Sequence, residues 1–427
     1  MRVGIQSWGS MGDVRPMLCL GHALVRAGHQ VVFAATCVDA VDHAETCRRL
    51  GLEHLPAPSL VTVELSQLRQ GLLAGHALSQ LSTLYDQLLL PSVPMMREVS
   101  QALCQRCDVV VGHFLVHPLR AAAERADRPH LSVAFWPGMV PGAQQPPWPL
   151  PDLGAWSNRL CWALVRRMIN RTLLPRVAED WTRLGLPRPR DVLRDCWYAP
   201  RGNLLACSPQ LYPQTAAWPE QHLCGAFHVL PDDSQTLLPP VVEAFLAEGP
   251  PPVLLTLGSP QLLDPQGAMA LLIALARRLG CRALINTTSP AHPAWTREER
   301  ICFTGGLNHR LIMPRCAAIL HHGGAGTSHA AARAGRPSLV VAFIDEQLAW
   351  GWTLHRRQVA ARPLRYRHAT VERLVGRMRR CLQDPMMRQH AQELGARMAQ
   401  EDGSARAVDI IAGACSEMHA HAWPQDL

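Results

Sequence analysis

The sequence predicts a soluble α/β protein of two doubly wound domains, each built on a parallel sheet. Both halves of the 427-residue chain repeat one pattern, in which an apolar strand runs through a glycine-containing loop into a helix and then into another strand. Such units require a parallel sheet, because consecutive strands of one direction need a crossover connection. The hydrophobic share of 48% supports a sizeable core and is too high for a disordered chain.

The first unit begins with an apolar strand at residues 3–7. A loop over 8–15 follows, and Pro16 opens a helix that ends before Gly28. Residues 30–36 form the next strand. This order of strand, loop, helix and strand places the loop at the carboxyl edge of the sheet, where open α/β sheets bind ligands.

A second strand of this half is predicted at 108–112, with His113 at its carboxyl end. The chain loses its periodicity near residues 231–240, which predicts a linker. We therefore expect domains at 1–232 and 233–427, and leave open whether the final helix packs back on the first domain. The elements predicted for the second half are a strand at 253–257, a helix at 265–279 and a strand at 281–286.

Composition excludes several classes of function. All 42 basic residues are Arg, so a lysine nucleophile, a Schiff base and a P-loop lysine are absent. The net charge of +8 is spread without a basic block, which argues against nucleic acid and favours an anionic small molecule or a lipid surface. With no long apolar segment at the start or elsewhere, we expect a cytoplasmic protein without a membrane span.

The strongest local signal is the stretch 317–329, AAILHHGGAGTSH, in which an apolar strand meets three glycines and a helix. Glycines let backbone N–H groups approach an anion, and a helix start near Thr327 adds unpaired donors with positive dipole character. A tight turn that needs glycine only for its geometry is the plainer alternative. The residues expected to hold a phosphate are His322, Gly323, Gly324, Ala325, Gly326 and Thr327.

The loop after the first strand also carries glycines but lacks the GxGxxG spacing of a dinucleotide site. No acidic residue ends the second strand at Thr36 to bind a ribose, which disfavours a nicotinamide cofactor. Asp13 lies at the tip of this loop. Its two interpretations are a helix cap and a functional carboxylate.

Together these two segments resemble the inverting glycosyltransferases of the GT-B architecture, in the UDP-sugar group of sterol glucosyltransferases and of glycopeptide and macrolide glycosyltransferases. Residues 9–16, GSMGDVRP, resemble the opening motif of that family, and residues 321–328, HHGGAGTS, resemble its donor loop. The resemblance extends over residues 1 to about 400. It implies two Rossmann-like domains that face each other across a cleft, with the acceptor on the first and the nucleotide sugar on the second.

By this resemblance Asp13 is the general base, and no metal or other cofactor is required. The sequence agrees with a metal-free reaction in having no Asp-x-Asp pair. Plant relatives carry His at the loop position and Asp at the strand end, whereas this chain has Asp13 and His113. An exchanged pair is therefore one interpretation of His113, and an independent histidine is the other. The remaining donor contacts that the resemblance implies are Ser10, Gly12, Ser259 and His309.

The motif that binds sugar hydroxyls in the family resembles residues 343–351, FIDEQLAWG. The aligned pair is Glu346 and Gln347, where the family has Asp and Gln. Asp345, one position earlier, is an alternative carboxylate for binding the sugar. We expect a UDP-hexose donor, with glucose first, although this change leaves the sugar open, and the choice of UDP over dTDP is open too.

A helix over 156–177 belongs to no strand–helix unit and carries Arg159, Arg166, Arg167 and Arg171 among apolar residues. This pattern predicts either a helix that covers the domain and has a solvated basic face, or a segment that binds the acceptor or a membrane surface. The expected acceptor is a hydrophobic lipid, sterol-like or polyketide-like hydroxyl compound, and contact with the inner membrane face stays open. The alternatives are a catalytically silent partner protein and an NAD-dependent oxidoreductase.

Overall fold

The computed structural model describes residues 1–38, 41–58, 65–74, 77–212, 221–227, 237–258, 263–286, 293–306 and 308–416. These residues fall into two compact units. Unit 1 is drawn from 1–63, 81–230 and 402–427, and unit 2 from 64–80 and 231–401. Each unit is an α/β fold with its own sheet, so the predicted fold class is confirmed.

The sheet of unit 1 has the strand order β3-β2-β1-β4-β5-β6-β7, and its described pairs are all parallel. The central pair aligns Gln6 with Gly112, so the carboxyl ends of β1 and β4 meet at one edge. The strands are β1 (Arg2–Gly9), β2 (Gln30–Cys37), β3 (Glu53–His54), β4 (Val109–His113), β5 (His130–Ala134), β6 (Asn203–Leu205) and β7 (Gln221–Leu223).

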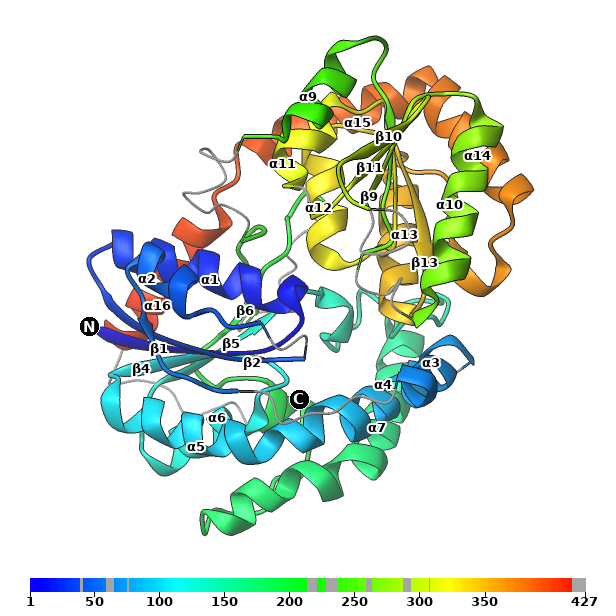
Figure 1. Cartoon of the computed structure of the whole chain (residues 1–427). Helices are drawn as coiled ribbons and strands as arrows, with labels where there is room; N and C mark the ends of the chain where they lie inside the picture. The colour runs from blue at the N-terminus through cyan, green and yellow to red at the C-terminus, as the bar shows by residue number, and fades with distance from the viewer. Residues whose placement is uncertain are drawn as a thin grey trace. The chain divides into compact units, whose positions relative to one another are not determined.

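Helices cover both faces of this sheet, α1 and α16 on one side and α5 and α6 on the other (Figure 1). The last helix packs on α1, and Gly403 at its start lies against the backbone of Gly225. The helices are α1 (Met11–Arg26), α2 (Ala44–Leu50), α5 (Leu90–Arg106), α6 (His117–Arg125), α7 (Ala155–Arg183) and α16 (Gly403–Ser416), while α4 (Ala77–Leu84) crosses the unit boundary.

Unit 2 has the strand order β10-β11-β9-β8-β12-β13-β14, with only β10 antiparallel among the described pairs. The strands are β8 (Val253–Leu255), β9 (Ala283–Asn286), β10 (Thr296–Glu298), β11 (Ile301–Thr304), β12 (Ala318–His321), β13 (Ser338–Ala342) and β14 (Leu364–Arg365). The helices are α3 (Leu65–Ala74), α9 (Pro240–Ala247), α10 (Pro265–Leu279), α11 (His309–Ile312), α12 (Ala325–Arg333), α13 (Asp345–Arg356), α14 (Val371–Gln383) and α15 (Pro385–Ala399).

Two helix starts differ from the prediction, and both differences bear on the site. The first helix begins at Met11 and not at Pro16, because Ser10 and Asp13 form a capping box that starts it earlier. The helix of the second glycine loop begins at Ala325, two residues before the predicted Thr327, with Gly324 as its N-cap.

The unit division is less simple than the predicted domains at 1–232 and 233–427. The predicted boundary falls among residues 228–236, outside the described residues. Residues 64–80 cluster with unit 2, although they precede most of unit 1 in the sequence. One contact of this segment is the Gln80 side chain, which accepts a hydrogen bond from the Asp345 backbone N–H at 3.0 Å.

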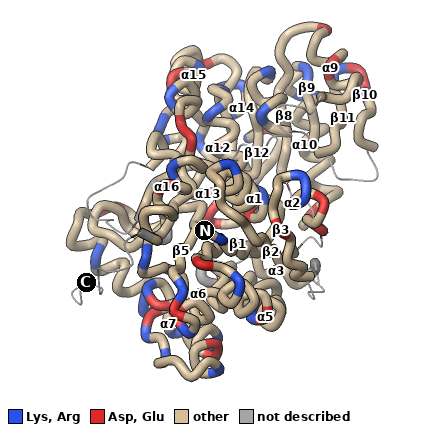
Figure 2. Tube along the Cα trace, turned by 90° about the vertical axis from the view of Figure 1, so that its left-hand side faces the viewer, with Lys and Arg blue, Asp and Glu red and all other residues tan. Residues whose placement is uncertain are grey.

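Acidic and basic residues are interspersed along the trace of both units (Figure 2). Among the helices in the described ranges, none is long and apolar enough to cross a membrane.

Two helical glycines of unit 2 give a test of the packing. A Cβ on Gly376 in α14 would meet nothing within 4 Å, whereas one on Gly395 in α15 would lie 2.7 Å from the Gly335 Cα. Alanine raises helix propensity at both positions by about 1 kcal/mol. We predict that Gly376→Ala raises the unfolding temperature and that Gly395→Ala lowers it, because the overpacked backbone costs about 1–3 kcal/mol. Thermal unfolding followed by circular dichroism checks this; equal shifts for the two variants would contradict the packing.

Candidate functional site

Asp13 is held at the carboxyl edge of the unit 1 sheet by the first turn of α1. Its Oδ2 accepts hydrogen bonds from the Ser10 backbone N–H at 3.0 Å and from the Ser10 hydroxyl at 3.3 Å. The Ser10 Oγ in turn accepts from the Gly12 N–H at 3.3 Å. The Asp13 side chain remains 36% exposed. The carboxylate is therefore both a cap and a group open to solvent, so the two interpretations of this residue do not exclude each other.

Gly9 makes room for this carboxylate. Its φ of +125° is a conformation that residues with a Cβ rarely adopt. A Cβ built on Gly9 would lie 2.3 Å from the Asp13 Oδ2. Glycine at this position is thus required twice, by the backbone and by the side chain that it faces.

His113 stands beside Asp13, at the end of the neighbouring strand β4. Its Nε2 lies 4.0 Å from the Asp13 Oδ1, and its side chain is buried. The Leu115 backbone N–H donates to the His113 Nδ1 at 3.4 Å, so the proton of a neutral ring is on Nε2, which faces Asp13. Burial lowers the pKa of His113 to about 3, and the imidazole is neutral near pH 7. The structure thus brings the two predicted residues together.

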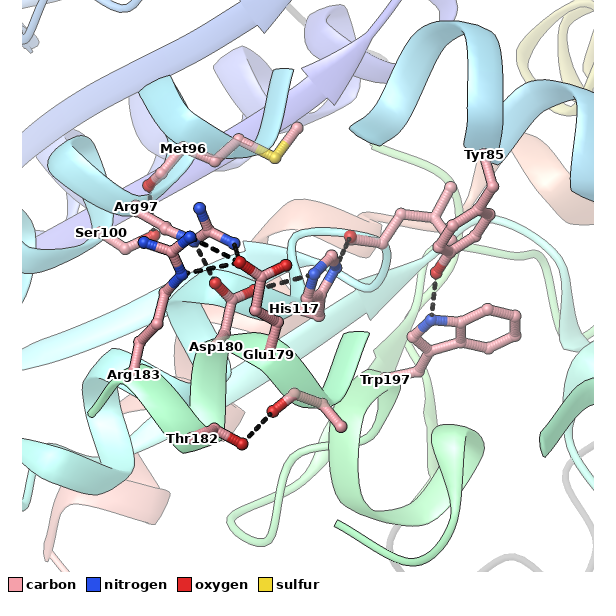
Figure 3. Close-up of polar contacts among 12 residues, drawn as sticks. Tyr85, Met96, Arg97, Ser100, His117, Glu179, Asp180, Thr182, Arg183 and Trp197 are labelled. Atoms are coloured by element: carbon pink, nitrogen blue, oxygen red, sulfur yellow. Dashed lines mark hydrogen bonds and ion pairs between the residues drawn. The ribbon is translucent and has the colours of Figure 1, made fainter. Parts of the chain in front are cut away.

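A chain of polar contacts continues from His113 into the protein. The Leu115 carbonyl lies 3.4 Å from the His117 Nδ1, and the His117 Nε2 lies 2.9 Å from the Asp180 Oδ2. Arg97 pairs with the other oxygen of Asp180 (Figure 3). Burial alone would raise the pKa of Asp180, but His117 and Arg97 outweigh it and hold this pKa below its ordinary value. No pattern in the sequence predicts this cluster, because its members come from three separate helices, α5, α6 and α7.

Aromatic rings lie next to His113. The ring centroids of Phe114 and Phe135 are 4.8 Å and 5.4 Å from that of His113. Trp197 meets Phe114 edge to face at 5.5 Å, and its Nε1 donates to the Tyr85 hydroxyl at 2.8 Å. Phe114 and Phe135 thus give the His113 ring apolar neighbours, whereas Trp197 and Tyr85 are buried core residues.

In unit 2, the glycine loop ends strand β12 and starts α12. Gly323 has a φ of +91°, and a Cβ there would lie 2.5 Å from the Gln347 carbonyl oxygen. No side chain caps the helix at Gly324, so the first turn offers the backbone N–H groups of Ala325, Gly326 and Thr327. Such a helix start suits a phosphate.

His322 fills the space between two glycines of this edge. A Cβ on Gly258 would lie 2.7 Å from its ring, and one on Gly324 would lie 2.4 Å from its Nε2. Its Nδ1 is buried and has no hydrogen-bond partner among the described residues. Burial and the nearby His309 lower the pKa of His322 to about 4, so the ring is neutral near pH 7. A neutral imidazole with an unused nitrogen is suited to a ligand hydrogen bond.

The polar residues in the first turn of α13 differ in the contacts that they make. Asp345 is buried and paired with Arg365, which removes it as a competitor for a sugar. The Gln347 Oε1 accepts from the backbone N–H of Phe343 at 2.9 Å, so this amide oxygen caps the turn. Glu346 is half-buried beside them. Of the two carboxylates, Asp345 is thus the one paired with Arg365.

The predicted site residues thus divide between the units. Asp13, His113, Ser10 and Gly12 lie in unit 1, and the role of Ser10 and Gly12 as donor contacts stays a prediction. His309, His322, the glycine loop and Gln347 come together in unit 2. Ser259 lies outside the described residues.

No group of three or more His, Cys, Asp or Glu side chains in the described ranges could hold a metal ion. That the reaction needs no metal stays a prediction.

Comparisons with known proteins agree over most of the chain. Residues 305–414 match the family described as Erythromycin biosynthesis protein CIII-like, C-terminal domain. The chain is 30% identical to O-mycaminosyltylonolide 6-deoxyallosyltransferase of Streptomyces fradiae, over 96% of this chain and 97% of that protein. It is 28% identical to the vancomycin aglycone glucosyltransferase of Amycolatopsis orientalis, over 81% of this chain and 82% of that one.

The fold has a solved counterpart in the Streptomyces sp. SF2575 glycosyltransferase SsfS6, complexed with thymidine diphosphate. The TM-score is 0.64 at 20% identity, covering 97% of this chain and 99% of that one. The two Rossmann-like sheets and the sequence relatives lead to one assignment: the chain belongs to the GT-B glycosyltransferases of the macrolide and glycopeptide group.

Proposed function

We propose that this glycosyltransferase moves a hexosyl residue from a nucleoside-diphosphate sugar to a hydroxyl group of a hydrophobic small molecule, with inversion at the anomeric carbon. The observation that carries the proposal is the juxtaposition of Asp13 with the neutral His113 at one sheet edge. The family assignment removes the oxidoreductase alternative that the sequence left open.

In this mechanism the Asp13 carboxylate takes the proton of the acceptor hydroxyl. The acceptor oxygen forms a bond to C1 of the sugar while the bond from C1 to the phosphate oxygen breaks, and the nucleoside diphosphate leaves. The His113 Nε2–H faces Asp13 and favours its ionised form. Because His113 is neutral near pH 7, it orients the base without neutralising it.

The leaving diphosphate is assigned to unit 2. The uncapped N–H groups of α12 and the unused nitrogen of His322 supply donors where negative charge develops. Glu346 and the amide nitrogen of Gln347 are the groups proposed to bind sugar hydroxyls.

UDP-glucose is the donor expected from the sequence, and the names of the relatives widen this choice. One is named a glucosyltransferase and another a 6-deoxyallosyltransferase, and SsfS6 was solved with thymidine diphosphate. We propose a hexosyl donor, and the transfer assay decides whether its nucleotide is UDP or dTDP.

The acceptor is proposed to be a polyketide-like or other apolar hydroxyl compound, since Phe114 and Phe135 form an apolar wall beside His113. Of the tryptophans around residues 136–162, Trp162 is a core residue whose Nε1 donates to the Gln145 carbonyl, and Trp156 is 76% exposed.

Asp13→Asn tests the reaction and the base together. Transfer from UDP- and dTDP-hexoses to a panel of macrolide and glycopeptide aglycones is measured by mass spectrometry. We predict transfer by the wild type and a loss of at least ~100-fold in kcat for Asp13→Asn, because the amide cannot accept the proton. No transfer by the wild type from any donor would favour the silent partner protein, and an active Asp13→Asn would exclude Asp13 as the base.

Asp180 is proposed as a positioning residue for this pair. It orients His117, whose Nδ1 faces the Leu115 carbonyl, and the N–H of Leu115 fixes the tautomer of His113. Loss of the Asp180 charge would free the turn at residues 113–117 and with it the His113 ring.

Asp180→Asn is compared with Asp191→Asn, a matched control. Asp191 is also a buried carboxylate paired with an arginine, Arg166, and this carboxylate's other hydrogen bonds among the described residues come from Asn170 and Arg194, not from the turn at residues 113–117. We predict that Asp180→Asn lowers kcat by about 10- to 100-fold and moves the acid limb of the pH profile upward, because misplacement of His113 weakens its support of ionised Asp13. Equal kcat and pH profiles at matched unfolding temperatures would reduce Asp180 to a structural role.

A further inference from the structure

We propose that the outward side of α7 docks on an anionic lipid surface, independently of the proposed transfer reaction. Four large apolar side chains of α7 point to solvent, spaced by four residues, and Leu153 precedes them. Their exposed fractions lie between 46% and 76%. Residues four apart share one side of a helix, so these groups form a single stripe. The α7 stripe consists of Leu153, Trp156, Leu160, Leu164 and Met168.

Exposed apolar residues are concentrated in and next to the α7 stripe. Twelve large hydrophobic residues are exposed in the described part of the chain, and six of them fall within residues 150–168. Single exposed apolar residues are ordinary on a protein, but a contiguous set marks an interaction surface.

The other side of α7 is fixed in the core, so the stripe cannot turn inward. Ile169 and Leu173 are buried. The Trp162 Nε1 donates to the Gln145 carbonyl at 2.9 Å, and the Asn158 amide donates to the Ala143 carbonyl at 2.9 Å. The α7 stripe is therefore exposed to solvent without any rearrangement of the helix.

Charge selects the partner. Arg159, Arg167 and Arg171 are exposed next to the stripe, and no ion pair of theirs occurs among the described residues. The sequence has no acidic residue from Ala155 to Ala178. Arg166, which lies among them in the sequence, instead pairs with Asp191 at 3.0 Å. Arginine stems can lie on apolar surface while their guanidinium groups bind lipid phosphates.

A second copy of the chain fits this surface less well. Symmetric pairing places the same patch on both partners, so it would bring the arginines of two α7 helices together. An anionic bilayer instead supplies an apolar interior for Trp156 and the leucines and negative headgroups for the arginines. Tryptophan and arginine are residues that favour the membrane–water interface.

The test is cosedimentation of the full chain with vesicles of phosphatidylcholine alone and with vesicles that also contain the anionic lipid phosphatidylglycerol, whose negative surface attracts arginines. We expect binding to the anionic vesicles that falls with added salt. The triple variant Arg159→Gln, Arg167→Gln, Arg171→Gln should lose about 100-fold in affinity, at about fivefold for each arginine. Leu160→Gln, Leu164→Gln should lose at least tenfold.

Met386→Gln, Arg388→Gln on α15 is the matched control, because it removes an exposed apolar residue and an exposed arginine elsewhere. It should bind as the wild type does. Equal binding by all variants, or none by the wild type, would overturn the proposal. A concentration-dependent dimer in light scattering that Leu160→Gln, Leu164→Gln abolishes, without vesicle binding, would assign the stripe to a second copy.

Discussion

A buried carboxylate must be compensated, and in unit 1 this constraint falls on Asp180, which is 2% exposed. Its partners Arg97 and His117 come from α5 and α6, so one ionic group ties α5, α6 and α7 together under the sheet. Removing one partner of such a group would leave a charge without compensation in the core. The same group includes His117, whose Nδ1 lies 3.4 Å from the Leu115 carbonyl in the turn at residues 113–117, and His113 is at the start of that turn.

The two units place different chemistry at equivalent edges of their sheets. In unit 1 the first turn of α1 is closed by its own cap, and Asp13 serves as that cap while remaining accessible. In unit 2 the first turn of α12 has no side-chain cap, and the Nδ1 of the neighbouring His322 has no hydrogen-bond partner among the described residues. A capped helix start can present a carboxylate, and an uncapped one can receive a phosphate. This difference underlies the proposed division between proton transfer and donor binding.

Much of this arrangement follows from local sequence. The strand–loop–helix pattern predicts both sheets, and the motifs at residues 9–16 and 321–328 predict Asp13 and the glycine loop at their carboxyl edges. The starts of α1 and α12 were predicted two to five residues too late. In α1 the Ser10–Asp13 capping box starts the helix ahead of Pro16, and in α12 the N-cap is Gly324, which has no side chain to mark the start.

What local sequence does not contain is pairing between distant side chains. Arg97, His117 and Asp180 have no spacing that joins them, and only packing of the helices brings them together. In the same way, Asp345 and Glu346 are adjacent carboxylates, and only the position of Arg365 separates their roles. Which tryptophan of α7 is core and which is exposed depends on the side of the helix that faces the sheet.

The division of labour between the units is tested most directly by calorimetric titration of UDP and dTDP into the wild type, Asp13→Asn and His322→Ala. We predict that one of the two nucleotides binds the wild type and Asp13→Asn with equal affinity. We also predict that His322→Ala loses at least about tenfold in affinity for that nucleotide, as expected for a lost hydrogen bond to a charged group. Nucleotide binding that survives His322→Ala and is lost in Asp13→Asn would contradict this division of labour.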